Sequence, residues 1–241
     1  PHTYRDLMFH CELTGFLAFT LETQVESKLL LLFDEVYNGD TVNPLRLGCG
    51  NCITLFLKPG RYQFMTMEPY SLKYLRFVAA EGSVTVNHPH IRRAGFPEVA
   101  SKWVTQDPDL KLIYDAAIET FRQNTYDIYM DCPSRERAGW LCDSFFTSRV
   151  EKFLTGGSEV EREFLTNFLD CKEYPGLPHG MLPMCYPADH PNHMYIPNWA
   201  MWVGLELEEY LKRTGDHMLI ARAEPKGREL LHFFQRYENS D

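Results

Sequence analysis

The spacing of apolar residues changes at one point in the chain, near Phe96-Pro97. Upstream of this point, short apolar runs rich in β-branched and aromatic residues are separated by turn signals such as Pro59-Gly60. Such runs are typical of β-strands. Downstream, apolar residues recur at three- and four-residue steps, which is the period of an amphipathic helix. The sequence therefore predicts a strand-rich region followed by a helix-rich region.

Six runs in the first region are predicted to be strands, and together they favour an antiparallel β-sandwich. In one run Tyr62, Phe64 and Thr66 alternate with the residues between them, so that the strand has two distinct faces. The predicted strands are Gly15–Glu22, Lys28–Phe33, Cys52–Lys58, Arg61–Glu68, Leu72–Ala79 and Ser83–His88.

Five helices are predicted in the second region, where cap residues and apolar spacing agree. Asp107 is a predicted N-cap, with Pro108 at the first helical position. Ser158 and Glu161 occupy capping-box positions, and Pro225 is expected to bend the last helix. The predicted helices are Pro108–Asn124, Ser144–Thr155, Ser158–Leu169, Asn198–Arg213 and Asp216–Arg236.

The two regions also differ in charge. Residues 1–96 carry nine basic and nine acidic side chains, whereas residues 97–241 carry fifteen and twenty-four, so the net charge of −9 lies entirely in the second region. A negative chain without a block of Lys or Arg lacks the electrostatic footprint for phosphate backbones or anionic lipid. The longest apolar stretches, near Phe16–Phe19 and Leu29–Phe33, are far shorter than a membrane span. Neither nucleic acid nor membrane is expected as a partner.

The most informative segment is a loop between the first two predicted helices. Its sequence is Asp131-Cys132-Pro133-Ser134-Arg135-Glu136-Arg137-Ala138-Gly139-Trp140-Leu141-Cys142-Asp143. It concentrates three carboxylates, two arginines and a tryptophan. Pro133 and Gly139 argue against a continuous helix, so we predict a loop that leads into the helix starting near Ser144.

Two carboxylates of this loop are expected to differ in pKa. Asp143 would lie at the positive end of a helix dipole, which favours its ionised form. Glu136 would keep a proton at neutral pH if it lay against Trp140 in a dry pocket and neither Arg135 nor Arg137 pointed at it. Such a pair suits acid catalysis beside a developing cation. The alternative is structural: a helix N-cap at Asp143 and surface Arg–Asp pairs.

The loop resembles the signature loop of the bacterial and fungal α-L-rhamnosidases. In that family an Asp-Cys-Pro start, an Arg, a Glu-Arg pair, a Gly-Trp and a closing Asp recur in the order seen here. The resemblance covers about residues 60–216. It includes Glu68-Pro69, Lys73–Phe77, Asp109–Tyr114, Gly180–Pro183 and Ile196–Trp202.

The resemblance implies an inverting glycosidase with an (α/α)6 catalytic barrel. Glu136 aligns with the general acid of the family. Asp131 and Asp143 would accept hydrogen bonds from sugar hydroxyls and stabilise the oxocarbenium-like transition state. Trp140 would provide an apolar wall for the methyl group of rhamnose.

Three further residues complete the predicted substrate-binding set: Arg135, Asn198 and Trp199. Trp199 and Trp202 lie three residues apart on one helix face. They could form an aromatic platform for a sugar ring or pack in the core between helices. Asn198 stands where relatives commonly have Asp, so the sugar preference is expected to differ. The family also often has one more acidic residue between the positions of Arg135 and Glu136.

Part of the implied machinery is expected to lie outside the sequence. An (α/α)6 barrel takes twelve helices, more than the second region can supply. We therefore expect the second Glu of the family, the general base, to lie beyond Asp241. Glu206, Glu208 and Glu209 are expected to form a solvated face of their helix.

Several cysteines and histidines are spaced like metal ligands. An odd total of seven cysteines excludes a complete disulfide framework. Cys49 and Cys52 have the spacing of half a zinc site or a redox pair, but no second ligand pair follows, and strand-like sequence lies on both sides. One loop contains four residues that could form a metal cluster, although a loop lining a sugar pocket is the stronger interpretation: His179, Asp189, His190 and His193. We predict no metal and no cofactor.

The resulting hypothesis is an internal piece of a longer rhamnosidase-like glycoside hydrolase. Residues 1–96 would be the C-terminal part of a β-sandwich domain, and residues 97–241 the N-terminal half of the catalytic barrel. The expected substrate is a rhamnose-containing glycoside or polysaccharide, and activity would need the rest of the polypeptide. The rival hypotheses are another (α/α)6 glycosidase and a non-catalytic carbohydrate-binding protein. A secreted or periplasmic location is implied by the family, with a cytoplasmic one left open.

Overall fold

The computed structural model of the 241-residue chain describes residues 3–97, 99, 103–171, 176–188 and 194–239. By their contacts, the residues form two units. The β unit comprises Pro1–Gly95 and Pro133–Arg135, and the helical unit comprises Phe96–Cys132 and Glu136–Asp241. None of the helices in the described ranges has the length and apolar character needed to cross a membrane.

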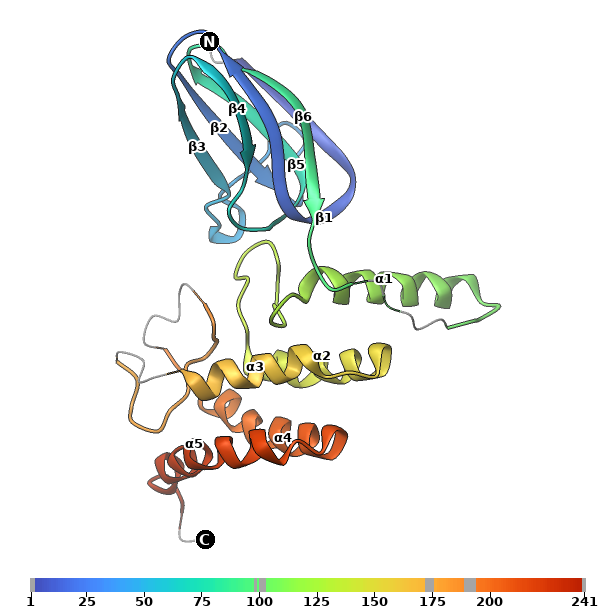
Figure 1. The fold of residues 1–241 in the computed structure, drawn as a ribbon, viewed down its shortest axis with the longest axis vertical. Coiled ribbons are helices and arrows are strands. Elements are labelled where there is room, and N and C mark those ends of the chain that lie inside the picture. Colours follow the sequence, from blue (N-terminus) through green and yellow to red (C-terminus); the bar gives the residue numbers. More distant parts are fainter. Residues whose placement is uncertain (1–2, 98, 100–102, 172–175, 189–193, 240–241) are drawn as a thin grey trace. The chain divides into compact units, whose positions relative to one another are not determined.

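The β unit is an antiparallel sheet that curls on itself (Figure 1). Its described strands are β1 (Thr3–Thr23), β2 (Ser27–Asp34), β3 (Cys52–Leu57), β4 (Gly60–Met65), β5 (Tyr70–Glu81) and β6 (Thr85–Arg93). The strand order is β3-β2-β5-β1-β4, and β6 also pairs with β1. The predicted fold class, an antiparallel β region followed by helices, is confirmed.

The long strand β1 belongs to both parts of the curled sheet. Its first part pairs with β5 and its second part with β4 and β6. The change occurs at Gly15, whose register partners are Tyr70 in β5 and Arg93 in β6. A Cβ on Gly15 would lie 2.3 Å from the carbonyl oxygen of Arg92, so only glycine allows this close approach. The sequence prediction missed the first half of β1, because most of residues 3–12 are exposed and show no apolar run.

The core of the β unit is apolar and lies inside the curl. Phe19 of β1 contacts Phe64 of β4 and Phe77 of β5, with ring centroids 4.8 and 5.2 Å apart. These contacts join the parts of the sheet that meet at β1. The buried members of this core are Leu17, Phe19, Leu21, Leu29, Leu31, Phe33, Leu57, Leu72, Leu75 and Phe77.

The helical unit contains five α-helices in its described residues (Figure 1). They are α1 (Pro108–Asn124), α2 (Leu141–Thr155), α3 (Glu159–Asp170), α4 (Pro197–Thr214) and α5 (His217–Gln235). Helix α2 packs against α3 and α4, and α5 packs against α3 and α4. The Asp107 side chain accepts hydrogen bonds from the backbone N–H groups of Asp109 and Leu110, as the cap prediction requires.

The start of α3 is capped differently from the prediction. Ser158 precedes the helix, but its side chain makes no capping hydrogen bond. Instead the Glu151 carboxylate, on α2, accepts hydrogen bonds from the backbone N–H groups of Val160 and Glu161 at 3.1 and 3.2 Å. The predicted capping box of Ser158 and Glu161 was therefore wrong. A residue from another helix satisfies the free N–H groups, which no local sequence pattern can indicate.

Candidate active site

The loop of residues 131–139 is held together by hydrogen bonds between its two ends. The backbone N–H of Asp131 donates to the Ala138 carbonyl at 3.3 Å, and the N–H of Ala138 donates to Asp131 Oδ1 at 3.4 Å. The N–H of Arg137 donates to the Cys132 carbonyl at 3.0 Å. Arg137 has a φ of 51°, in the left-handed region, which lets the chain turn back towards Ala138. These contacts set the direction of both loop ends.

A second segment supports the end of this loop. Gly139 and Tyr186 form a backbone hydrogen bond of 2.8 Å, and Trp140 forms a β-bridge with Cys185. A Cβ on Gly139 would lie 2.6 Å from the Tyr186 carbonyl oxygen and 2.7 Å from the Phe164 ring, so glycine is required here. The chain then enters α2 with Trp140 at the N-cap position. Residues 139–141 are therefore firmly placed.

Helix α2 begins three residues earlier than predicted. The sequence indicated a start near Ser144 with Asp143 as the alternative N-cap, whereas the helix starts at Leu141 and Asp143 lies in its first turn. The N-cap position is occupied by Trp140, whose side chain makes no capping hydrogen bond. The local signals Pro133 and Gly139 did not show where the loop ends. The helix begins directly after the β-bridge at Trp140.

Asp131, Cys132 and Glu136 are brought together by the turn. One ligand atom from each of the three side chains lies within 4.8 Å of the others. The backbone N–H of Glu136 donates to Cys132 Sγ at 3.2 Å, which contributes to this arrangement. The group is partly exposed, and in the described parts of the chain no other set of three such residues meets this criterion. It concentrates negative charge where hydroxyl groups or a cation could be bound.

Asp143 is half-buried and close enough to Asp131 for their charges to interact. Burial raises the pKa of the Asp143 carboxyl and the Asp131 carboxylate raises it further, whereas a backbone hydrogen bond lowers it. The net shift is upward, so the expected effect of the helix dipole, which would favour the ionised form of Asp143, is outweighed. The dipole effect is about 0.3–1 kcal/mol, which burial beside a like charge can exceed.

Two tryptophans, one just before α2 and one on α4, contact each other. Trp140, before α2, and Trp199, in the first turn of α4, form an edge-to-face pair with centroids 5.1 Å apart and an interplanar angle of 81°. Trp140 Nε1 is buried without a hydrogen-bond acceptor among the described residues. Asn198, next to Trp199, is exposed. Trp202 instead packs against Phe145 of α2, at 4.7 Å, so the two α4 tryptophans have different surroundings.

Arg135 is exposed, and the division of the chain into two units assigns it, with Pro133 and Ser134, to the β unit. The structure thus brings Asp131 together with Glu136, sets Asp143 within electrostatic reach of Asp131, and pairs Trp140 with Trp199. Asp189, His190 and His193 lie outside the described residues. Cys49 and Cys52 are not joined by a disulfide.

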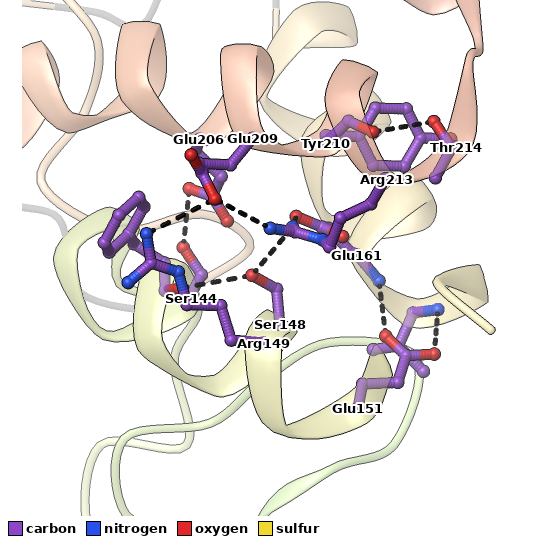
Figure 2. A network of polar contacts seen from close by, with 12 residues as sticks. Ser144, Ser148, Arg149, Glu151, Glu161, Glu206, Glu209, Tyr210, Arg213 and Thr214 are labelled. Atoms are coloured by element: carbon purple, nitrogen blue, oxygen red, sulfur yellow. Dashed lines mark hydrogen bonds and ion pairs between the residues drawn. The ribbon is translucent and has the colours of Figure 1, made fainter. Parts of the chain in front are cut away.

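Sequence reasoning misplaced one acidic residue in the interior. Glu206 of α4 was expected on a solvated face, yet its exposed fraction is 0%. Its Oε2 lies 2.9 Å from the Ser144 hydroxyl of α2 (Figure 2). Glu208 is exposed as predicted, and Glu209 is only partly buried. Glu206 was detectable, because Ala200, Val203, Glu206 and Tyr210 recur at helical spacing and form the buried face of α4.

The helical region matches the sequence profile of a known family. The sequence profile described as bacterial alpha-L-rhamnosidase 6 hairpin glycosidase domain matches residues 98–240, which include the loop, both tryptophans and Asp143. No curated protein matches the chain. The match covers more than half of the sequence.

Solved structures agree over nearly the whole chain. The crystal structure of a GH78 family rhamnosidase of Bacillus sp. GL1 is 22% identical, with a TM-score of 0.81 over 99% of this chain and 25% of that one. A rhamnosidase from Klebsiella oxytoca with rhamnose bound is 17% identical, with a TM-score of 0.72 over 99% of this chain and 49% of that one. The curled sheet and following helices match the β domain and the start of the α-helical barrel of such enzymes.

The fold is therefore a curled β region followed by helices, arranged as in the β domain and the start of the helical barrel of these structures. The chain belongs to the bacterial α-L-rhamnosidase six-hairpin glycosidase family. It spans between a quarter and a half of the length of the two structures compared.

Proposed function

We propose that the protein carrying this chain is a glycoside hydrolase that releases terminal α-L-rhamnose with inversion of configuration. One observation carries the proposal: the family-matched segment brings Asp131 and Glu136 together on one turn, sets Asp143 within electrostatic reach of Asp131, and contains the Trp140–Trp199 pair. Carboxylates beside an aromatic wall suit a sugar ring that becomes positively charged during hydrolysis.

In this mechanism Glu136 donates a proton to the glycosidic oxygen. It is partly exposed on the turn, so a leaving group can approach it from solvent. Asp131 and Asp143 accept hydrogen bonds from the sugar hydroxyls and stabilise the oxocarbenium-like transition state. Their negative charge counts most when the ring carbon is most positive, which lowers the barrier rather than only tightening ground-state binding.

The aromatic residues and their neighbours shape the proposed sugar-binding site. Trp140 offers an apolar surface to the methyl group of a 6-deoxy sugar, and Trp199 holds the Trp140 ring by edge-to-face contact. The buried Trp140 Nε1 has no acceptor in the described part of the chain and can donate to a substrate oxygen. Asn198 and Arg135 complete the proposed binding set as polar contacts to more distant parts of the substrate.

We further propose how the chain fits into the whole enzyme. Residues 1–96 form the C-terminal part of a β-sandwich domain, and residues 97–241 form the N-terminal half of an (α/α)6 catalytic barrel. The general base, a second Glu, comes from the rest of the polypeptide. The limited coverage of the related structures by this chain supports this division.

The test is hydrolysis by the full-length protein. Nitrophenyl α-L-rhamnoside should be cleaved, and the first rhamnose released should be the β anomer by NMR, as inversion requires. Cleavage of other aryl glycosides, but not of the rhamnoside, would support the alternative of another (α/α)6 glycosidase. Binding of rhamnose without cleavage of any glycoside would support a non-catalytic carbohydrate-binding protein.

The proposed location rests on the same resemblance. We propose a secreted or periplasmic enzyme, with the cytoplasm as the alternative. Fractionation of cells followed by activity measurement decides between the two.

A further inference from the structure

A buried carboxyl group links the two helices that carry the proposed sugar-binding residues. Glu206, on α4, is completely buried and lies 2.9 Å from the Ser144 hydroxyl of α2 (Figure 2). Ser144 is the residue after Asp143, in the first turn of α2. On α4, Glu206 is two turns from Trp199. The contact therefore joins the start of α2 to the helix that begins with Asn198 and Trp199.

The hydrogen-bond pattern indicates which of the two groups donates the proton. The Ser144 hydroxyl also lies 2.6 Å from the carbonyl oxygen of Leu141, which can only accept. Ser144 has a single hydroxyl proton, and the shorter contact with Leu141 uses it. The Ser144 oxygen then accepts from Glu206, and Glu206 can donate only in its protonated form.

The surroundings of Glu206 contain no cation free to pair with it in the described structure. Arg213 of α4 bonds to Glu161 of α3 and to Glu209, so its charge is already shared. Glu206 Oε1 is buried without a hydrogen-bond partner in the described part of the chain. An ionised carboxylate with an unsatisfied oxygen in such a site is very costly, whereas a neutral acid is tolerable.

The net effect of burial and of the charges around Glu206 is in the same direction. The groups that interact electrostatically with it are Cys142 of α2, Tyr129 before α2, Glu161 of α3 and Arg213 of α4. Burial raises the pKa of Glu206 well above its usual value, and the nearby Glu161 raises it further. The Ser144 contact and Arg213 lower it by less. The neutral form of Glu206 thus agrees with both geometry and charge.

We propose that Glu206 is a positioning residue of the sugar site: as a neutral acid it donates to Ser144 and fixes the first turn of α2 to α4. Trp140, just before α2, and Asp143, in its first turn, thereby keep their positions relative to Trp199 on α4. Because it concerns the same site, this inference rests on the proposed function for its activity readout. The protonation of Glu206 and its bond to Ser144 do not depend on that function.

The activity test compares three variants of the full-length protein with Glu208→Gln, which alters an exposed carboxylate on the same helix. Glu206→Gln keeps a donor of similar shape and should keep kcat/KM within about threefold. Glu206→Leu and Ser144→Ala remove the link and should lower kcat/KM about 10- to 100-fold, the size expected when sugar-binding groups shift slightly. The wild-type rate should fall at high pH in a limb that Glu206→Gln lacks, because ionised Glu206 cannot donate.

Infrared spectroscopy tests the protonation directly. The wild type minus Glu206→Gln difference spectrum at neutral pH should contain the carbonyl stretch of a protonated carboxylic acid, and Ser144→Ala should shift its frequency. A carboxylate band in place of the acid band would overturn the inference, as would Ser144→Ala and Glu206→Leu variants with wild-type kcat/KM. A wild type that is inactive on rhamnosides while the acid band is present would refute the proposed function alone.

Discussion

The β unit buries a carboxyl group with an arginine partner, whereas the helical unit, besides the Glu161–Arg213 pair, buries two carboxyl groups without one. In the β unit, Asp34 is 1% exposed and receives two hydrogen bonds from Nε of Arg46, at 2.9 and 2.8 Å from its two oxygens. In the helical unit, Glu151 and Glu206 are fully buried and have no ion pair in the described part of the chain. Backbone N–H groups and a tyrosine satisfy Glu151, and Ser144 contacts Glu206.

This difference separates two ways of burying an acid. A buried carboxylate with its own arginine adds no net charge to the interior. The helical unit places part of its acidic excess inside, where a glutamate must be capped by N–H groups, share a guanidinium or carry a proton. Buried acids without cations are a cost to stability, and they tend to mark places where geometry matters for function.

The largest expected effect concerns the chain when it is produced without the rest of the polypeptide. The 241-residue chain produced alone should have no detectable activity on nitrophenyl α-L-rhamnoside, because the proposed base lies elsewhere in the enzyme. Exposed apolar side chains such as Leu112 and Ile113 on α1, and Phe153 on α2, favour aggregation of this piece. Size-exclusion chromatography and an activity assay on the monomer peak check this. A monomeric and active chain would refute both the barrel topology and the location of the base.

The next effect distinguishes sugar binding from proton transfer. Asp143→Asn and Asp131→Asn should each weaken rhamnose binding and reduce kcat/KM by about 10- to 100-fold, since each removes one charged hydrogen-bond acceptor, worth about 1.5–3 kcal/mol. The limb of the pH–rate profile assigned to the general acid should remain in both variants. If that limb is lost in Asp143→Asn, Asp143 rather than Glu136 is the proton donor.

A smaller effect compares the two buried acids directly. Asp34→Asn leaves Arg46 without its main partner and should lower the free energy of unfolding of the β unit by roughly 3 kcal/mol. Glu206→Gln replaces a neutral acid by a neutral amide. It should change the free energy of unfolding of the helical unit by less than about 1 kcal/mol. Hydrogen exchange measured by mass spectrometry in increasing urea reports on the two units separately. Equal losses would mean that Glu206 is ionised and paired.

The smallest effect is an opposite dependence of stability on pH in the two units. Hydrogen bonds from Arg76 lower the pKa of Asp6, so the contribution of Asp6 is present above its unfolded pKa and is lost as pH falls through the folded value. The pKa of Glu206 is raised, so its contribution is present at low pH and is lost as pH rises through the folded value. Asp6→Asn should reduce the acid sensitivity of the β unit by about 0.5 kcal/mol, the size of an exposed pair.

The Glu206→Gln substitution should remove the loss of stability that the helical unit shows as pH rises. Hydrogen exchange across a pH series in all three proteins measures both effects. A helical unit that is equally sensitive to alkali in wild type and Glu206→Gln would show that Glu206 does not titrate as the structure indicates.

Local rules in the sequence predicted most of the fold. Helix α1 begins at Pro108 after the Asp107 cap and ends at Asn124 as predicted, because cap, proline and apolar spacing all lie within one segment. The first half of β1 and the capping of α3 by Glu151 were missed. Both depend on residues far away in the sequence, which a window of ten or twenty residues cannot contain.

The candidate site was predicted in part for the same reason. The turn that gathers Asp131 and Glu136 is local, and sequence reasoning found it. The pairing of Trp140 with Trp199 and the burial of Glu206 require α2 to pack on α4. The pKa of Asp143 also depends on burial, so its direction could not be obtained from helix position alone.

The central claim is that Glu136 is the general acid of a rhamnosidase, and one comparison of substrates tests it most directly. In the full-length protein, Glu136→Gln should lower kcat on a natural rhamnose disaccharide by about 10²–10⁴, the usual worth of general acid catalysis. The loss should be much smaller on dinitrophenyl α-L-rhamnoside, whose leaving group needs no proton. Near wild-type rates on the disaccharide, or equal losses on both substrates, would contradict the assignment.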